Sequence, residues 1–531
     1  MTPFNTILSN SAYLILVTIF VRSFSNLNNL ISNIKWVIDS NLILRKVKNK
    51  NTSEKYVICI PMLREQGIVS ETLKYFSQFN YPTDRFEIVV VTTNKEAYDK
   101  KSKSVLLYKL ATDISLGKQY QKIKAKYLGL FPVEVLNKIY TDYQLKNVST
   151  ILVSIRKIYR NMPTTFELAI KEAKKINSQF RQKMVSVINY PNKNGVMSHQ
   201  INYAIKKLGI NNQHSNSIFA VYNADSRPNL NTLKFVTATL REFETKTGFR
   251  PNIVQQSSLF TLNYNEYPKT ITGYILKGAS LFQTKWTLVR ELSRFRAQSL
   301  SSINYKDNFL SKIFNTKISH CVGHGLFVRF RVLKNEYLPT ETINEDLPFG
   351  YYQCCKGEPI LPLPILENSE SPESITSLIN QKRFWFTPYL EYRSCRNRVL
   401  QNKKYRSRLE VEVLTAQAEL TGIIWLFQSF ILFAPLIIGM YLLSKLLIFL
   451  WVIGILIYWF IPIGMIYVSL SKLEKVAGKS TSNTSIIDYL LSSFAGLYIL
   501  LTHSLGPILC IRDFALAKII NKPIVKLKTE R

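Results

Sequence analysis

The sequence predicts an α/β protein with a mostly parallel sheet, joined to transmembrane α-helices. Two observations predict this class. Between residues 56 and 91, two apolar runs of strand length flank a stretch with helical spacing, which is the pattern of a parallel βαβ unit. Near both termini, apolar segments are too long and too unbroken for a soluble protein.

The composition calls for an anionic partner. Lysine and arginine number 69 against 35 acidic residues, which gives a net charge of +34. Nucleotide phosphates and an anionic membrane face satisfy this charge, whereas no motif supports nucleic acid as a partner. The six cysteines form no C-x-x-C pair and are expected to be reduced thiols. The segment from His320 to His324 lacks a second ligand pair at zinc spacing, so we expect no zinc site.

The N-terminal apolar run predicts an uncleaved membrane anchor. It spans residues 7–21 and is closed by Arg22, and Phe24 and Leu27 can extend it toward bilayer length. No basic residue precedes it and no small-residue cleavage site follows, which argues against a signal peptide. The positive-inside rule then predicts an outside N-terminus and a cytosolic middle region, because the basic residues follow the run at Arg22, Lys35, Arg45, Lys46, Lys48 and Lys50.

The βαβ unit comprises a strand at 56–61, a helix at 68–79 and a strand at 86–91 that ends at Thr92, Thr93 and Asn94. Residues 97–182 are different: they are lysine-rich, have helical spacing, and predict an inserted helical subdomain. Its basic face either lies on lipid headgroups or is simply solvated. The strand pattern resumes at 183–190, and a helix carrying Asn202 follows at 196–208.

Residues 218–228 are the stretch around which the prediction is organised. An apolar run of strand length ends abruptly in Asn223, Ala224 and Asp225, and Pro228 prevents its continuation. Ligands bind beyond the C-terminal ends of parallel strands, and a carboxylate beside an amide oxygen suits a divalent ion carrying a phosphate. The alternative is an Asn/Asp turn that closes a core strand.

Further along, residues 252–260 predict a strand with Gln255, Gln256 and Ser257 on a polar, pocket-facing side, and 274–300 are largely helical. Three weaker motifs follow. Gly323, His324 and Gly325 suit a close backbone approach to a ligand. Glu345 and Asp346 are adjacent carboxylates, which are also common at helix N-termini. The segment 381–386 mixes cations and aromatics, which suits a pyrophosphate and a sugar ring or, alternatively, a membrane-interface anchor.

The C-terminal third predicts three more membrane segments, at 423–443, 446–470 and 486–501. A basic amphipathic stretch to about residue 419, which includes Lys403 and Lys404, precedes them. The loop 471–483 carries Lys472, Lys475 and Lys479, as expected for a cytosolic loop. Four spans would place the C-terminus outside, yet the tail is basic, and we favour a cytosolic or interfacial tail.

Taken in order, these pieces resemble the membrane-embedded family 2 glycosyltransferases, which include cellulose, hyaluronan and related polysaccharide synthases. The motifs that carry the resemblance lie at 57–61, 201–204, 223–225, 323–325, 344–346 and 381–385, and the tail at 522–530 resembles that of many bacterial members. The resemblance covers most of the chain except the insert. Each motif is weak, but six in order between membrane segments are a strong signal.

The resemblance implies a GT-A-type nucleotide-diphospho-sugar transferase domain and inverting transfer of a sugar from a nucleotide-sugar donor to a lipid-linked or glycan acceptor. Asp225 would hold Mg²⁺ or Mn²⁺ with help from Asn223, Asp346 would be the general base, and Glu345 would orient the acceptor or that base. The remaining implied substrate-binding residues are Thr92, Thr93, Gly323, His324, Gly325, Gln381, Lys382, Arg383 and Trp385.

Four positions depart from the family pattern. Thr92 and Thr93 stand where an aspartate would contact the base, which leaves uridine in question. Asn223 replaces the first aspartate of the D-x-D motif, Met197 replaces a lysine, and Phe384 replaces an arginine, with Arg383 one place earlier. These departures raise a rival hypothesis, an inactive glycosyltransferase-like membrane scaffold. Retention of Asp225 and Asp346 favours the enzyme.

The predicted organisation is an anchor at 1–27, a cytosolic transferase domain at 51–390 with the insert at 97–182, an interfacial region at 391–420, membrane helices at 421–510 and a basic tail at 511–531. We expect an integral protein of the plasma (inner) membrane, in contact with membrane lipids.

Overall fold

The computed structural model describes residues 3–46, 53–127, 130–210, 214–402, 405–478 and 485–520. The basic residues Lys48, Lys50, Lys403, Lys404 and Lys479 and the tail at 522–530 lie outside the described residues. The chain divides into two compact units: unit 1 comprises residues 1–51, 227–326 and 341–529, and unit 2 comprises residues 52–226, 327–340 and 530–531.

Unit 2 is built on a parallel sheet. Its strands β1 (Tyr56–Pro61), β2 (Phe86–Thr93), β3 (Val185–Tyr190) and β4 (Ile218–Val221) lie in the order β3-β2-β1-β4, and the pairs β1–β2, β2–β3 and β1–β4 are all parallel. β1 and β4 are apolar and almost fully buried, as expected when helices cover both faces of a parallel sheet. The predicted class, α/β with a mostly parallel sheet, is confirmed for this unit.

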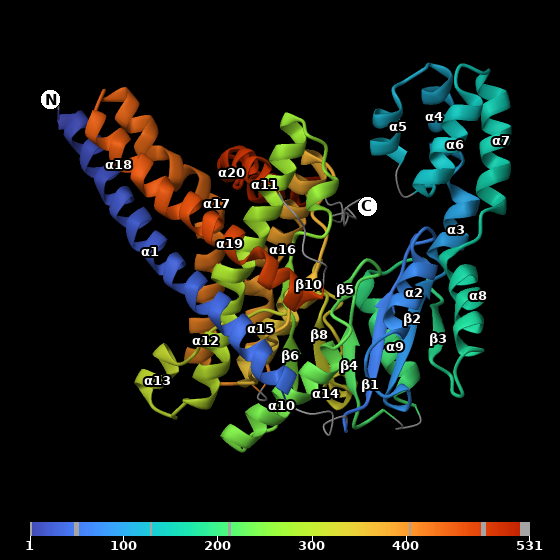
Figure 1. Ribbon diagram of the computed structural model, residues 1–531, viewed down its shortest axis with the longest axis horizontal. Coiled ribbons are helices and arrows are strands. Elements are labelled where there is room, and N and C mark those ends of the chain that lie inside the picture. The colour runs from blue at the N-terminus through green and yellow to red at the C-terminus, as the bar shows by residue number, and fades with distance from the viewer. Residues whose placement is uncertain are drawn as a thin grey trace. The chain divides into compact units, whose positions relative to one another are not determined.

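Helices α2 (Val69–Ser77), α8 (Thr165–Asn177) and α9 (Met197–Leu208) connect and cover these strands (Figure 1). The predicted βαβ unit is confirmed, with β2 extending through Thr93. The strand β8 (Leu326–Arg329) leads into α14 (Phe330–Asn335), where Arg329 and Glu54 form a buried ion pair at 3.3 Å.

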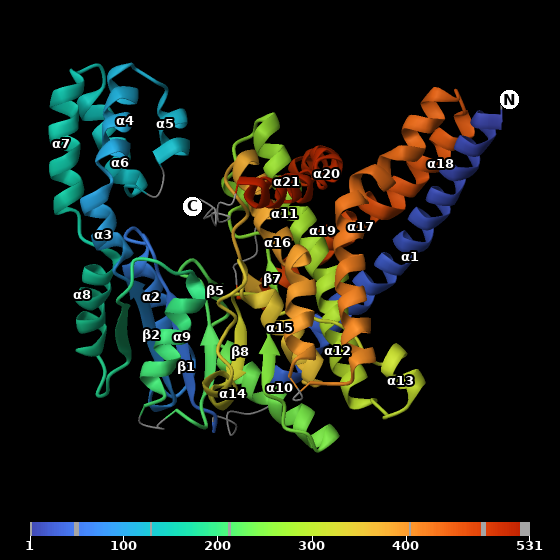
Figure 2. The ribbon, with the colours of Figure 1, turned by 180° about the vertical axis from the view of Figure 1, so that it is seen from behind.

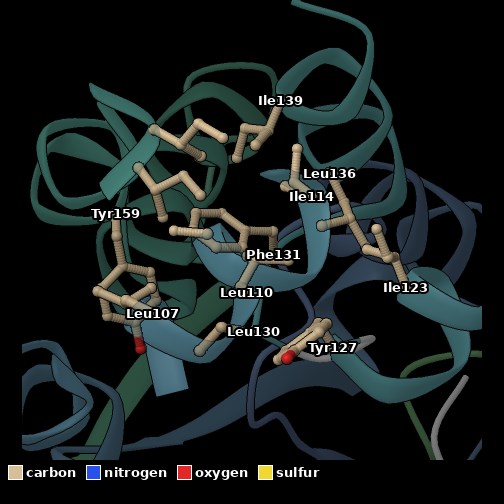
Figure 3. Close-up of a cluster of buried hydrophobic side chains, with 13 residues drawn as sticks. Leu107, Leu110, Ile114, Ile123, Tyr127, Leu130, Phe131, Leu136, Ile139 and Tyr159 are labelled. Carbon is tan, nitrogen blue, oxygen red and sulfur yellow. The ribbon is translucent and has the colours of Figure 1, made fainter. Parts of the chain in front are cut away.

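The insert forms a helical group with a core of its own at one end of the unit 2 sheet (Figure 1). It follows α3 (Lys95–Ser102) and contains α4 (Ser104–Ser115), α5 (Tyr120–Tyr127), α6 (Val133–Tyr143) and α7 (Val148–Asn161). Leu110, Ile114, Leu136 and Tyr159 point into this core of aliphatic and aromatic side chains (Figure 3). The apolar side chains that recur at helical spacing in the sequence are therefore buried against one another within the insert.

Unit 1 holds short strands and long helices. β6 (Ile253–Gln255) and β9 (Ile360–Pro362) pair in parallel, while β10 (Glu367–Asn368) pairs with β7 (Ser258–Leu259) and with β5 (Arg227–Pro228). The single strand predicted at 252–260 is therefore wrong: it is split into β6 and β7. β6 pairs with β9, whereas β7 pairs with β10 in a separate three-stranded sheet, so the chain passes from one sheet to another between Gln255 and Ser258.

The remaining elements of unit 1 are helices, among which are the 3-10 turn η2 (Tyr264–Glu266) and two π-helical turns, η3 and η4. They are α1 (Pro3–Lys46), α10 (Thr232–Thr247), α11 (Ile271–Trp286), η3 (Thr287–Glu291), α12 (Leu292–Ile303), α13 (Phe309–Phe314), α15 (Asp346–Lys356), α16 (Ile375–Leu400), α17 (Arg408–Tyr441), α18 (Lys445–Ile455), η4 (Leu456–Phe460), α19 (Ile461–Ala477), α20 (Ile486–Leu501) and α21 (Leu505–Ile520).

Among the described residues, four helical stretches are long and apolar enough to cross a membrane: Pro3–Ile43, Arg408–Tyr441, Lys445–Ala477 and Ile486–Ile520. They correspond to the four predicted apolar segments, but each helix is longer than the apolar run that identified it. α1 packs along α17, α18, η4 and α19, as both views show (Figures 1 and 2).

Candidate functional site

The turn after β4 lies where the strand order of unit 2 reverses. β1 pairs with β2 on one side and with β4 on the other, so the C-terminal ends of β1 and β4 flank a topological switch point. Asn223, Ala224 and Asp225 follow β4 at this position. Ligands of open α/β sheets bind in the crevice outside the strand ends at such a point. Asn223 and Asp225 therefore lie after the C-terminal end of a parallel strand, as the sequence predicts.

A helix side chain that the sequence did not single out holds this turn. Thr72 in α2 is fully buried, and its hydroxyl donates to Ala224 O at 2.5 Å. Ser226 N donates to Asn223 O at 3.1 Å, which closes the turn. Asn223 and Asp225 are half-buried, and within the described residues the Asn223 side chain makes no hydrogen bond. The Thr72 hydroxyl and one backbone hydrogen bond therefore fix the turn while the Asn223 amide oxygen stays available.

Thr92 and Thr93 end β2, and both are buried. The Thr92 hydroxyl donates to Asn189 Oδ1 at 3.1 Å, and the Thr93 hydroxyl donates to Asn192 O at 3.2 Å. These contacts join the ends of β2 and β3. Both threonines therefore hydrogen-bond to the residues at the end of β3, and their predicted contact with the nucleotide base stays a prediction.

Asn202 of α9 clamps the segment that follows α14. Its amide donates to Leu338 O at 2.8 Å and accepts from Leu338 N at 2.9 Å. A side-chain amide that mimics a backbone pair in this way fixes the position of the bonded segment. Residue 338 stands just ahead of the motif at 344–346 in the sequence.

In unit 1, the glycine loop and the acidic pair come together. Asp346 is the first residue of α15, and its Oδ2 accepts from Gly323 N at 2.6 Å. Its Oδ1 accepts from Leu347 N at 2.7 Å, and Asn344 Oδ1 accepts from Asp346 N at 3.2 Å. The carboxylate is therefore held in one orientation from two sides. Glu345, the preceding residue, is buried, with 4% of its surface exposed.

The loop itself is fixed by β6. Gln255 accepts from Val322 N at 3.0 Å and donates to His324 O at 2.9 Å, and Gln256 N donates to Gly325 O. Gly325 has φ +61°, and a Cβ there would lie 2.8 Å from Gln256 Cβ, so only glycine fits. The prediction that Gln255, Gln256 and Ser257 face a pocket is wrong, because all three are buried and the glutamines hold the loop.

His324 contacts a buried carboxylate that sequence reasoning missed. Its Nδ1 lies 3.2 Å from Glu367 Oε2 and 3.4 Å from Ser258 Oγ, and Glu367 is 1% exposed. The signal was present, because Glu367 ends an apolar run at 360–366, as Asp225 ends an apolar run at 218–222. His320 instead lies 3.0 Å from Arg294, and burial, followed by that arginine, lowers the pKa of His320 to about 3.

The motif at 381–385 lies on α16. Gln381 accepts from Gln283 at 2.7 Å, and Arg383 forms an ion pair with Asp513 of α21. Lys382 is buried with its Nζ 5.6 Å from the Phe282 ring centroid, and burial lowers the pKa of its ammonium to about 7. Trp385 packs beside Phe386 and Trp425. The two cations are therefore held by the protein, one by an acid and one by apolar packing.

A metal would depend on oxygen ligands beyond the protein's own. The described residues contain no group of three or more His, Cys, Asp and Glu side chains arranged for a metal ion. Asp225 and Asn223 offer one carboxylate and one amide oxygen. Mg²⁺ is commonly bound by one or two protein carboxylates together with substrate phosphates, so this small oxygen donor set fits such an ion.

Comparisons with known proteins give distant likenesses. No family model and no curated protein sequence matches the chain. The solved structures that are similar include the mannosyltransferase PcManGT from Pyrobaculum calidifontis in complex with GDP-Man and Mn²⁺, at 9% identity and TM-score 0.41, covering 96% of this chain and 100% of that one. They also include S. aureus TarS 1-349, at 12% identity and TM-score 0.34, covering 89% and 93%. Both TM-scores lie below 0.5.

Proposed function

We propose that this protein is an integral membrane glycosyltransferase that moves a sugar from a nucleotide-sugar to a lipid-linked or polysaccharide acceptor, with inversion at the anomeric carbon. One observation carries the proposal: the turn with Asn223 and Asp225 follows β4 at the switch in strand order. This is the position at which an α/β sheet binds a phosphate-bearing ligand. The six ordered motifs and the four apolar helices support the same class.

On the donor side, Asp225 and Asn223 would hold Mg²⁺ or Mn²⁺ on the donor diphosphate. When bound, the ion supplies positive charge that neutralises the departing nucleoside diphosphate. Lys382 and Arg383 would steady the diphosphate. Arg383 can keep its ion pair with Asp513 while doing so, because a guanidinium offers five N–H donors.

On the acceptor side, Asp346 would be the general base. An alcohol is a weak nucleophile until its proton is removed, and a carboxylate in a fixed orientation removes it as the C–O bond forms. The hydroxyl oxygen attacks the anomeric carbon, its proton passes to Asp346, and the bond to the diphosphate breaks on the opposite face. Glu345 would orient the acceptor or the base, and Trp385 would stack on the acceptor sugar.

The four apolar helices support a location in a membrane, and we propose the plasma (inner) membrane with the transferase residues in the cytosol, as the positive-inside rule predicts. Carbonate extraction of membranes should leave the protein in the pellet. Its release into the supernatant would contradict the membrane assignment.

The test of activity is donor hydrolysis and transfer by detergent-purified protein, with a panel of nucleotide-sugars and Mg²⁺ or Mn²⁺. Metal-dependent nucleotide release by the wild type, lost in Asp225→Ala and in Asp346→Asn, would establish the enzyme and identify its donor. If no nucleotide-sugar of the panel is hydrolysed or transferred, and no metal-dependent nucleotide binding is detected, the inactive scaffold is favoured.

A further inference from the structure

Basic side chains gather inside the helix bundle of unit 1. Arg22 lies midway along α1, Lys285 lies near the end of α11, and Arg290 lies in η3. Lys285 is 5% exposed, and the Arg22 Nε is buried without a hydrogen-bond partner among the described residues. Arg22 lies in a helix that is long and apolar enough to cross a membrane, where a charged side chain is expensive to bury and marks a functional site more often than a structural one.

Hydrogen bonds hold α1 against η3. The Asn33 amide donates to Leu288 O at 2.6 Å and to Ser293 Oγ at 2.8 Å. Asn33 follows Arg22 by about three helical turns, so both side chains leave α1 on the same face. Arg22 therefore points toward the helices that carry Lys285 and Arg290.

Two π-helical turns flank Lys285. η3 interrupts the helix that contains Lys285, and η4 interrupts the helix formed by α18 and α19. The Lys285 ammonium donates to Tyr458 O in η4 at 2.5 Å and lies 3.9 Å from the Tyr458 ring centroid. Single π-turns inside α-helices occur frequently at functional sites. Their presence on both sides of one ammonium indicates that the local geometry serves a ligand.

The basic cluster lacks an anion. Within the described part of the chain, no carboxylate forms an ion pair with Arg22, Lys285 or Arg290. Glu291 follows Arg290 directly, but its carboxylate lies 4.0 Å from His320 Nε2 instead. Burial, with added repulsion from Arg22 and Arg290, lowers the pKa of Lys285 well below its usual value. Burial, followed by Arg22, lowers the pKa of Arg290 to about 10.

The same neighbourhood offers a neutral donor for an anion. Gln428, which is 2% exposed, donates to the Tyr458 hydroxyl oxygen at 2.9 Å. This leaves the Tyr458 O–H proton free to point to another acceptor. Two arginines, a lysine and a phenol are together a donor set suited to a phosphate group, because arginine binds phosphate oxygens bidentately.

We propose that Arg22, Lys285 and Arg290 bind the phosphate group of an anionic ligand within the helix bundle of unit 1. Two sources can supply this group: the headgroup of an acidic lipid, or a free phosphate or diphosphate. The exposed apolar surface of α1 favours the lipid source, since Val17, Val21 and Phe24 near Arg22 are more than half exposed and can lie against acyl chains. The site is independent of the proposed glycosyl transfer.

The test measures binding to the purified full-length protein in detergent micelles by native mass spectrometry. The two lipid probes are dioleoyl phosphatidic acid and dioleoylglycerol, which share their acyl chains and differ in the phosphate. We expect retention of the phosphatidic acid at least about tenfold above dioleoylglycerol. Lys285→Met and Arg290→Gln should each reduce that retention about tenfold or more, because each removes a charge from the phosphate.

Lys445→Met is the matched control, since Lys445 is an exposed lysine on α18 of the same bundle. It should leave retention unchanged. Arg22→Gln provides a further variant should Lys285→Met fail to elute as a single folded species. Equal retention of the two lipids, or full retention by both Arg22→Gln and Arg290→Gln, would overturn the proposal.

Competition separates the two sources. Inorganic phosphate or diphosphate is added at millimolar concentration to the complex with phosphatidic acid. If the phosphatidic acid stays bound, the lipid headgroup is the source of the phosphate. If either anion displaces the phosphatidic acid, and the Arg290→Gln variant binds neither the lipid nor the anion, the ligand of the site is a free phosphate or diphosphate. Because no sugar donor is present in this assay, its failure would leave the glycosyl transfer proposal unaffected, and the reverse also holds.

Discussion

Replacing Asp346 by asparagine separates the chemistry of this residue from its place in the fold. The two carboxylate oxygens accept separate backbone hydrogens, from Gly323 N at 2.6 Å and from Leu347 N at 2.7 Å. Asparagine retains one acceptor oxygen and turns an NH₂ group toward the other donor. One hydrogen bond is therefore lost, which should lower the free energy of unfolding by about 1–3 kcal/mol.

The expected loss of activity is much larger. Removing a general base costs about 10²–10⁴ in kcat, which corresponds to about 3–5 kcal/mol in the activation barrier. Donor affinity should stay within about threefold of wild type, because Asp346 acts on the acceptor hydroxyl. Transfer rates, nucleotide binding by calorimetry and thermal unfolding by tryptophan fluorescence measure the three effects separately.

Glu345→Gln is the control for this variant. It makes the same change of carboxylate to amide at the preceding residue, whose proposed role is orientation, so kcat should fall by less than about tenfold. The reasoning is refuted if Asp346→Asn keeps kcat within about threefold of wild type while its donor binding is unchanged. Loss of donor affinity in proportion to kcat would likewise assign Asp346 to the donor.

Three further changes test how the structure supports the site. Thr72→Val removes the hydroxyl that holds Ala224 O, so it should lower the free energy of unfolding by about 1 kcal/mol and weaken nucleotide binding, whereas Thr72→Ser should restore both. Wild-type nucleotide affinity of the valine variant, measured by calorimetry, would show that Thr72 does not support the site. Gly325→Ala places a Cβ 2.8 Å from Gln256 at φ +61°, and should lower thermal stability by about 2 kcal/mol or more. Burial lowers the pKa of Lys382 from 10.5 to about 7, so the unfolded chain binds more protons between these values and stability should rise with pH across that window. Lys382→Met should flatten the rise in pH-dependent melting curves, and an unchanged slope would show that another group causes it.

The sequence by itself determined the local elements. Short β-branched runs such as 56–61 and 86–93 form strands because their apolar side chains must be buried on both faces of a parallel sheet. The long apolar runs near the termini form helices, which satisfy their own backbone hydrogen bonds within one segment and are long and apolar enough to cross a membrane. The position of Asp225 at a strand end was also readable, since an abrupt change from apolar to polar residues is a local signal.

Tertiary structure alone decided which distant groups meet. The pairing of Gly323 with Asp346, of Thr72 with Ala224 and of Arg383 with Asp513 depends on helix and loop packing, and no periodicity in the sequence encodes it. The division of 252–260 into β6 and β7 likewise depends on pairing with β9 and β10, two strands far along the chain that belong to different sheets. Burial sets the pKa of Lys382, and burial together with neighbouring charge sets that of Lys285, because desolvation acts only after folding.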